Sequence, residues 1–141
     1  MRVMVLVKAS EESESGRMPK RDELNEMGKF NDQLIKAGIM LAGEGLVSSK
    51  EGKRVRFAGK GEATTVIDGP FTETKELVAG FWIWQVASLE EAVEWIKRSP
   101  FQDTEIEIRR VSEAEDFGAE LTPEMAAREQ ALRDQVASKQ Q

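Results

Sequence analysis

An almost unbroken apolar run at residues 80–86, GFWIWQV, is the feature that most limits the possible folds of this chain. A run this rich in aromatic and β-branched side chains predicts a strand, and both of its faces need cover from water. Residues 2–8, RVMVLVK, are also apolar on both faces. The two segments therefore predict the central strands of a sheet.

Two helices are expected from the 3.6-residue rhythm of apolar side chains. The first spans residues 20–37 and ends at Gly38, which can take the left-handed cap conformation. The second starts at a capping box of Ser88 and Glu91 and stops at Ser99-Pro100. Their buried stripes are expected to comprise Leu24, Met27, Leu34 and Ile35, with Phe30 at the edge, and Leu89, Ala92, Val93 and Ile96.

The remaining segments complete a pattern of strands and helices. Residues 9–19 read as a loop, residues 39–42 and 104–111 as strands, and residues 53–67 as a hairpin. This order predicts an α+β protein with a ferredoxin-like βαββαβ fold and an inserted β-hairpin. An appended C-terminal helix is expected at residues 123–137, where its apolar stripe is thin.

The change in character after Val111 suggests a division of the chain. Residues 1–111 are expected to form the ferredoxin-like domain, and residues 112–141 an acidic linker with a C-terminal docking helix. Helices cover one face of a ferredoxin-like sheet, yet both faces of the central strands are apolar. This predicts a homodimer in which the second face packs on another copy. The alternative is that the C-terminal helix covers that face within one chain.

The chain contains no histidine and no cysteine. Disulfides, cysteine–zinc sites and a Ser-His-Asp triad are therefore excluded. Proton transfer has to use Asp, Glu, Lys or water. No carboxylate spacing matches a recognised metal site, so we expect no metal and no other cofactor.

The formal net charge of −6 argues against nucleic acid as a partner. The one concentrated basic stretch, residues 50–60, is either a solvated hairpin or a surface that faces phosphate or carboxylate groups. No apolar run approaches the length of a membrane span, and the first residues lack the features of a signal peptide. We therefore expect a cytoplasmic protein without membrane contact.

A charged loop at residues 68–76, DGPFTETKE, lies between two apolar runs and is the first candidate site. Asp68 either caps the Gly69-Pro70 bend as an Asx-turn or points its carboxylate into a cleft. Glu73 and Lys75 share one side of an extended segment and could meet Glu44 in a pocket. The alternative is a salt-bridge network that fixes the loop or a dimer.

Aromatic side chains next to this loop supply the other candidates. Phe71 either anchors the loop in the core or stacks on a ligand. Trp82 and Trp84 share one strand face, which is either core or the wall of a cleft for a planar or apolar ligand. Asp68 and Glu73 are thus the expected catalytic residues, and the expected substrate-binding residues are Glu44, Phe71, Lys75, Trp82 and Trp84.

The loop at 68–76 followed by Gly80-Phe81 resembles the YCII-related (YciI-like) family, in particular its DGPF branch. Residues 43–46 and 88–92 support the resemblance, as do 115–118 and 121–124. The resemblance implies a ferredoxin-like fold assembled as a dimeric α/β barrel with a cleft. It also implies a histidine–aspartate pair in the wider family, which this chain cannot form because it has no histidine.

Function is expected at the level of binding rather than of a defined reaction. We expect a small organic molecule to bind in a dimer cleft, where carboxylates could carry out acid–base chemistry. The alternative is a non-enzymatic interaction or regulatory module, because the resemblance links DGPF-branch proteins to extracytoplasmic-function sigma factors.

Overall fold

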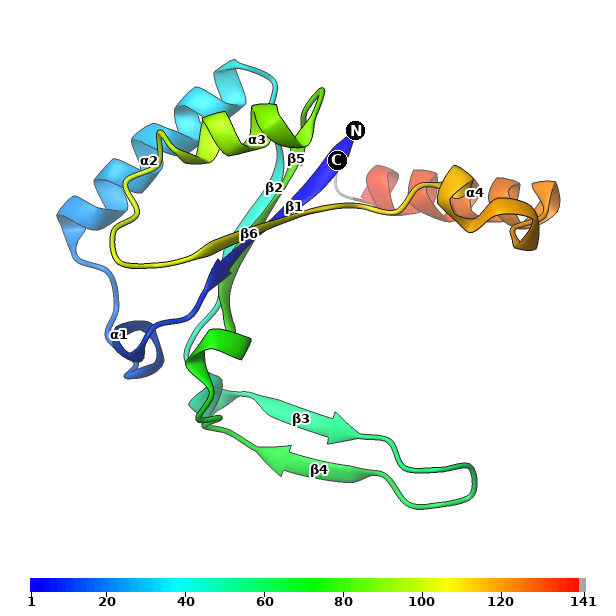
Figure 1. Ribbon diagram of the computed structural model, residues 1–141, viewed down its shortest axis with the longest axis horizontal. Coiled ribbons are helices and arrows are strands. Elements are labelled where there is room, and N and C mark those ends of the chain that lie inside the picture. Colours follow the sequence, from blue (N-terminus) through cyan, green and yellow to red (C-terminus); the bar gives the residue numbers. More distant parts are fainter. Residues whose placement is uncertain (140–141) are drawn as a thin grey trace. The chain divides into compact units, whose positions relative to one another are not determined.

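A computed structural model describes residues 1–139 of the chain (Figure 1). These residues form two compact units, Met1–Arg110 and the residues from Val111 onward. The C-terminal segment expected at 112–141 includes residues 140–141, which lie outside the described residues. That the first 111 residues fold as a separate domain stays a prediction.

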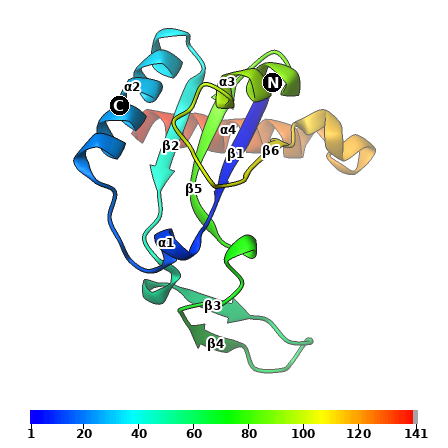
Figure 2. The ribbon, with the colours of Figure 1, turned by 60° about the vertical axis from the view of Figure 1, so that its left-hand side comes forward.

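A four-stranded antiparallel sheet is the centre of the first unit. Its strand order is β2 (Met40–Gly45), β5 (Val78–Gln85), β1 (Arg2–Lys8) and β6 (Ile106–Arg110). Helices α2 (Arg21–Lys36) and α3 (Leu89–Ile96) lie together on one face of this sheet (Figures 1 and 2). This order and layering confirm the ferredoxin-like α+β fold, with β1 and β5 at the centre as their apolar sequences predict.

The core lies between this sheet and the two helices. Val3 pairs with Trp84 and Val5 with Trp82 across the two central strands, and all four side chains are buried. They form one cluster with residues of the two helices and of the segments that flank the strands, namely Phe30, Leu34, Ile39, Val86 and Ala92. Alternation along β1 and β5 therefore sends one set of side chains to the helices and leaves Met4, Leu6, Phe81 and Ile83 on the opposite face.

The buried stripe of α2 differs from the expected one. Phe30 and Leu34 are buried, whereas Leu24 is 59% and Ile35 60% exposed. The helix presents the line through Met27, Phe30 and Leu34 to the sheet, and Leu24 and Ile35 lie about a quarter turn away from that line at 3.6 residues per turn. Phe30 is thus central to the interface rather than at its edge.

The stripe of α3 is also narrower than expected. Ala92 is buried and Ile96 packs against the core, while Leu89 and Val93 are exposed. Trp95, from the same helix, packs on the core as well. One half of the expected capping box forms, because the Ser88 hydroxyl accepts a 3.1 Å bond from the Glu91 amide. The Glu91 carboxylate accepts a 2.8 Å bond from the amide of Ala87 rather than from that of Ser88.

Residues 9–19 contain a short helix that the loop expectation missed. Helix α1 (Glu11–Glu14) is closed by a reciprocal cap. The Ser10 hydroxyl accepts a bond from the Ser13 amide, and the Ser13 hydroxyl accepts one from the Ser10 amide. Serine can play both parts of a capping box over so short a distance, so a single turn forms without an apolar stripe.

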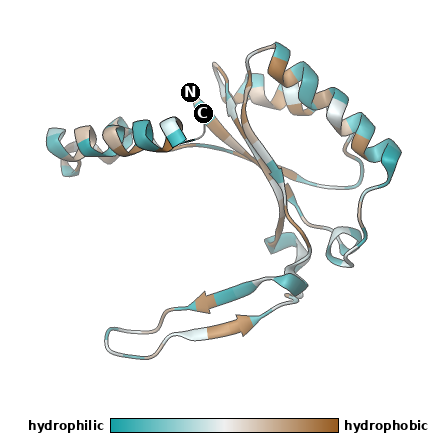
Figure 3. Ribbon diagram, turned by 180° about the vertical axis from the view of Figure 1, so that it is seen from behind, coloured by the Kyte–Doolittle hydropathy of each residue, from teal (hydrophilic) through white to brown (hydrophobic). Residues whose placement is uncertain are grey.

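The expected hairpin is a separate two-stranded sheet of β3 (Lys53–Arg56) and β4 (Thr65–Asp68), called the arm below. The short 3-10 turns η1 (Ser49–Glu51) and η2 (Thr74–Glu76) flank it in the sequence. Both strands of the arm carry hydrophobic residues (Figure 3). Of these, Val55 and Val66 pair with each other and are exposed, as is Phe57.

The second unit contains the 3-10 segment η3 (Ala114–Glu120) and helix α4 (Pro123–Lys139). Thr122 caps α4 as expected, since its hydroxyl accepts a 3.2 Å bond from the Met125 amide. The docking of α4 stays a prediction. No helix within residues 1–139 is long and apolar enough to cross a membrane.

Candidate functional site

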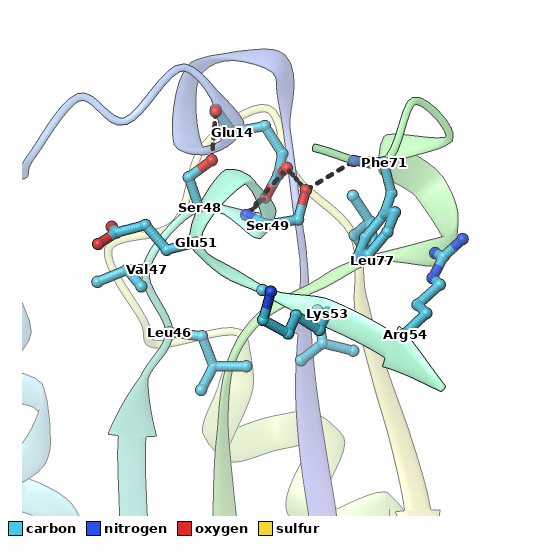
Figure 4. A pocket seen from close by; sticks show the side chains of 12 residues that line it. Glu14, Leu46, Val47, Ser48, Ser49, Glu51, Lys53, Arg54, Phe71 and Leu77 are labelled. Carbon is cyan, nitrogen blue, oxygen red and sulfur yellow. Dashed lines mark hydrogen bonds between the residues drawn. The ribbon is translucent and has the colours of Figure 1, made fainter. Parts of the chain in front are cut away.

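A pocket of about 410 Å³ lies where β2 ends and the arm begins (Figure 4). It is open to solvent. Segments far apart in the sequence contribute to it, from α1 to the first residues of β5. Its lining residues are Glu14, Leu46, Val47, Ser48, Ser49, Glu51, Gly52, Lys53, Arg54, Phe71, Leu77 and Val78.

The walls of the pocket are mixed in chemistry. Leu46, Val47, Leu77, Val78 and Phe71 provide apolar surface. The polar lining comes from two serines, two glutamates, a lysine and an arginine, and three of these six residues are in or next to η1. A concave surface with apolar walls and a few polar side chains is typical of sites for small organic molecules.

Glu14 joins α1 to η1 at one side of the pocket. Its carboxylate accepts bonds of 3.0 and 3.2 Å from the Ser49 amide, and a further bond from the Ser49 hydroxyl. The buried Ser48 hydroxyl donates a 2.7 Å bond to the Glu14 carbonyl oxygen. Because both serines bind Glu14, the polar end of the pocket is fixed in place.

Ser49 also holds the loop that carries Phe71. The Phe71 amide donates a 3.0 Å bond to the Ser49 hydroxyl, and the Gly69 amide donates a 3.0 Å bond to the Gly52 carbonyl oxygen. The Gly69–Pro70 peptide is cis. These bonds bring the loop at 68–71 against η1, so that the half-buried Phe71 ring forms part of the pocket wall.

Two cations of β3 line the pocket with different partners. The Lys53 ammonium lies 2.5 Å from a carboxylate oxygen of Asp68, its neighbour across the arm. The Arg54 guanidinium instead lies over the Phe71 ring, with Cζ 3.9 Å from the ring centroid. Arg54 and Phe71 therefore form one cation–π pair at the pocket wall.

Of the residues expected from the sequence to form a site, Phe71 lines the pocket. Asp68 is next to it in the chain, but its side chain is 75% exposed and pairs with Lys53. Within residues 1–139 no backbone amide donates to the Asp68 carboxylate, so the Asx-turn alternative is not what the loop forms.

The other charged residues expected at the site are exposed and lie outside the pocket lining. Glu44 is on β2 opposite Phe81, whereas Glu73 and Lys75 are at η2. No ion pair or hydrogen bond joins these three to one another or to Asp68 in the described part of the chain. Their roles in substrate binding and catalysis stay predictions.

Trp82 and Trp84 lie in the core rather than at the pocket. The Trp82 indole N–H donates a 3.0 Å bond to Asn31 Oδ1 of α2, and both rings pack against Phe30. The Trp84 N–H is buried without a partner among the described residues. Both indole rings are thus buried in the core, and a ligand-binding role for them remains a prediction.

Sequence reasoning did not single out Glu14, Ser48, Ser49 or Arg54 as site residues. Glu14 and Ser49 are 35 positions apart, and no motif spacing connects them. Arg54 belongs to the basic stretch at 50–60, where the sequence alone does not distinguish it from the other cations. Among residues 1–139, no group of three or more acidic side chains is placed to hold a metal ion.

Comparisons with known proteins place this fold and sequence in context. A search of curated protein sequences found no significant match. Among solved structures, the chain is similar to 5-chloro-2-hydroxyhydroquinone dehydrochlorinase (TftG) from Burkholderia phenoliruptrix AC1100, in complex with 2,5-dihydroxybenzoquinone. The identity is 18% and the TM-score 0.46, over 82% of this chain and 98% of that one. The model of the YCII-related domain matches residues 1–115, and the chain therefore belongs to the YCII-related domain family.

Proposed function

We propose that this protein binds a small organic molecule in the pocket beside η1. The proposal rests on one observation, which is that apolar and polar side chains line the same concave surface. Phe71, Leu46 and Val47 are apolar residues of this lining, and Ser48 and Arg54 are polar ones. Its volume of about 410 Å³ falls within the range of about 300–1,000 Å³ that is usual for ligand sites. Phe71 contributes to this wall, so one residue of the motif at 68–76 lies in the proposed site, while the charged residues of the motif lie outside the pocket lining.

A finer part of the proposal is acid–base chemistry carried by carboxylates. Asp68 and Glu73 remain the catalytic candidates from the sequence, and Glu14 adds a carboxylate that lines the pocket. A chain without histidine has few other groups that can move a proton near neutral pH. Turnover of a bound ligand that persists in Asp68→Asn, Glu73→Gln and Glu14→Gln variants would rule out this chemistry.

The binding proposal is tested by filling the pocket. Metabolites are screened by thermal shift, because a ligand of the native state raises the apparent melting temperature. Val47→Trp fills the pocket from its apolar wall, and Val66→Trp places the same bulk on the exposed arm. We expect Val47→Trp alone to abolish the shift. A shift that survives in this variant, or a broad library without any hit, would overturn the proposal.

We also propose a homodimer in which the sheet faces opposite α2 and α3 meet. Leu6 and Phe81 are paired across the central strands on that face, beside Met4 and Ile83. Apolar side chains on a sheet face without a helix favour contact with another apolar surface. Such a pairing of sheets would give the dimeric α/β barrel expected from the sequence.

The oligomeric state tests this pairing. Light scattering on the full chain should give twice the mass of one chain, and Leu6→Glu should give a monomer with an unchanged circular dichroism spectrum. Val66→Glu, which places the same charge on the arm, should remain a dimer. A monomeric wild-type protein at micromolar concentration would refute the pairing.

We further place the chain in the DGPF branch of its family. The support is the motif at residues 68–76, of which Phe71 lines the pocket. A phylogeny of YCII-related sequences that separates this chain from others with the same motif would contradict the placement.

A further inference from the structure

We infer that Arg54 is the anchor for a carboxylate group of the ligand, so that the pocket selects small carboxylic acids with an apolar body. The inference rests on the proposed function, because it assigns a chemical class to the ligand of the same pocket. It depends on the partner of Arg54, on the charge arrangement around it and on the shape of the guanidinium group.

The guanidinium of Arg54 is held in place but keeps its hydrogen-bonding capacity. Its Cζ lies 3.9 Å from the centroid of the Phe71 ring, and the Phe71 amide is itself bound to Ser49. An aromatic ring fixes a guanidinium through its face and accepts none of the in-plane N–H bonds. Over residues 1–139, no carboxylate or carbonyl oxygen accepts a bond from the Arg54 side chain.

Lys53 provides the contrast on the preceding position of the same strand. Its ammonium is paired with Asp68 at 2.5 Å across the arm. A ligand anion would have to compete with Asp68 for Lys53, whereas Arg54 offers five donors without such a competitor. Arg54 is therefore the lining cation that is ready for an external anion.

The acidic residues of the pocket do not oppose an anion at Arg54. The Glu14 carboxylate is bound by the amide and the hydroxyl of Ser49. In Figure 4, Glu51 and Val47 are on one side of the pocket, while Arg54 and Phe71 are on the other. This separation of charge would orient a ligand with its anionic end toward Arg54.

The chemistry of the walls points to a carboxylate with an apolar body. A guanidinium binds carboxylate and phosphate groups in a two-pronged manner, and both fit the planar fork of Arg54. The ring of Phe71 lies next to that fork, and Leu77 and Val78 add apolar surface to the same pocket. A pocket of about 410 Å³ has room for one aromatic ring or a short aliphatic chain beside the acid group.

The test compares acids with their neutral amides on the full chain. Binding of benzoate, phenylacetate and hexanoate is measured by NMR titration against benzamide, phenylacetamide and hexanamide, with inorganic phosphate as a separate arm. We expect at least one acid to bind with shifts at pocket residues, and its amide to bind about 10- to 100-fold more weakly, since charge-assisted bonds are the strong ones. Arg54→Gln should reduce acid binding by a similar factor, so that the acid then binds no more tightly than its amide.

The matched control is Arg56→Gln. Arg56 is two positions further along β3, carries the same charge and does not line the pocket. Equal loss of acid binding in both variants would show general attraction to the basic arm and would overturn the inference. Equal binding of acid and amide to the wild type would also overturn it, while leaving the proposed pocket intact. Phosphate binding as tight as that of the best acid would refute the claim that the pocket selects acids with an apolar body. A protein that binds none of the probes would count against both this inference and the proposed function.

Discussion

The carbonyl oxygen of Ser49 lies only 1.7 Å from the point that a Cβ atom at Gly69 would occupy. The backbone of the loop at 68–71 therefore touches the backbone of η1 directly. Glycine is required at this position because any side chain would overlap a backbone atom that cannot rotate away. The Gly69 position of the motif is thus explained by packing against Ser49, and this contact sets the wall of the pocket.

Gly69→Ala is expected to destabilise the protein by about 1–3 kcal/mol, the usual cost of forcing extra volume into a packed site. The measurement is urea unfolding followed by circular dichroism. Gly45→Ala is the control, because a Cβ there meets no atom within 4 Å. Its free energy of unfolding should stay close to the wild-type value, and an equally stable Gly69→Ala variant would contradict the contact.

Substitutions at Ser49 and Glu14 are expected to have coupled effects on the free energy of unfolding, which a double-mutant cycle measures. Ser49→Ala removes a hydroxyl that donates to Glu14 and accepts from the Phe71 amide. The free energy of unfolding should fall by about 1–3 kcal/mol, because the half-buried Phe71 amide and the Glu14 carboxylate lose partners.

Glu14→Gln completes the cycle, and the coupling energy should be about 0.5–3 kcal/mol. Ser15→Ala is the control, since among residues 1–139 the Ser15 hydroxyl bonds to Glu12 and Arg17 of the neighbouring turn and not to η1. Additive losses in the double variant would show that Ser49 and Glu14 act independently.

The fold follows from sequence patterns that are local and strong. The apolar runs at 2–8 and 80–86 gave the central strands, and the order of the segments gave the ferredoxin-like arrangement. The helix stripes were less accurate. Periodicity identifies a set of apolar side chains, but the line that meets the sheet depends on the size of the facing residues. Phe30 lies at the centre of the interface between α2 and the sheet because it packs against Trp82 and Trp84, with ring centroids 5.8 and 6.3 Å apart.

The pocket was less accessible to sequence reasoning because its contacts are long-range. The charged loop was correctly located between apolar runs, and Phe71 lines the pocket. The side chains that hold it there, Ser49 and Glu14, come from a short helix and a 3-10 turn without apolar periodicity. Polar residues in such turns look alike in a sequence, and only the folded chain shows which of them meet.

Asn31→Leu is expected to destabilise the core by about 1–3 kcal/mol. The Trp82 N–H donates a 3.0 Å bond to Asn31, and without it this buried donor would have no partner. Asn31→Asp keeps an oxygen acceptor at the same place and should lose less. Urea unfolding measures the free energy of unfolding of both variants. An Asn31→Leu variant as stable as the wild type would show that the bond contributes nothing net.

The ion pairs of Arg17 are expected to govern the titration of Glu23. A 2.8 Å hydrogen bond from the Arg17 guanidinium holds the pKa of the Glu23 carboxyl below its ordinary value, because the bond favours the charged form. Arg17→Gln should raise the pKa of Glu23, as measured by NMR titration of its side-chain carboxyl. Lys29→Gln, which removes a cation that pairs with Glu26 on the same helix, should leave that pKa in place.

The sign of the effect on stability follows from the lowered pKa of Glu23. Its contribution is fully present above the pKa of an unfolded glutamate and is lost as the pH falls through the folded value. The wild type should therefore lose more stability than Arg17→Gln on acidification through this range, by a small amount since the pair is at the surface. Parallel pH–stability curves for the two proteins, with no change in the Glu23 titration, would show that Arg17 does not hold this carboxylate in solution.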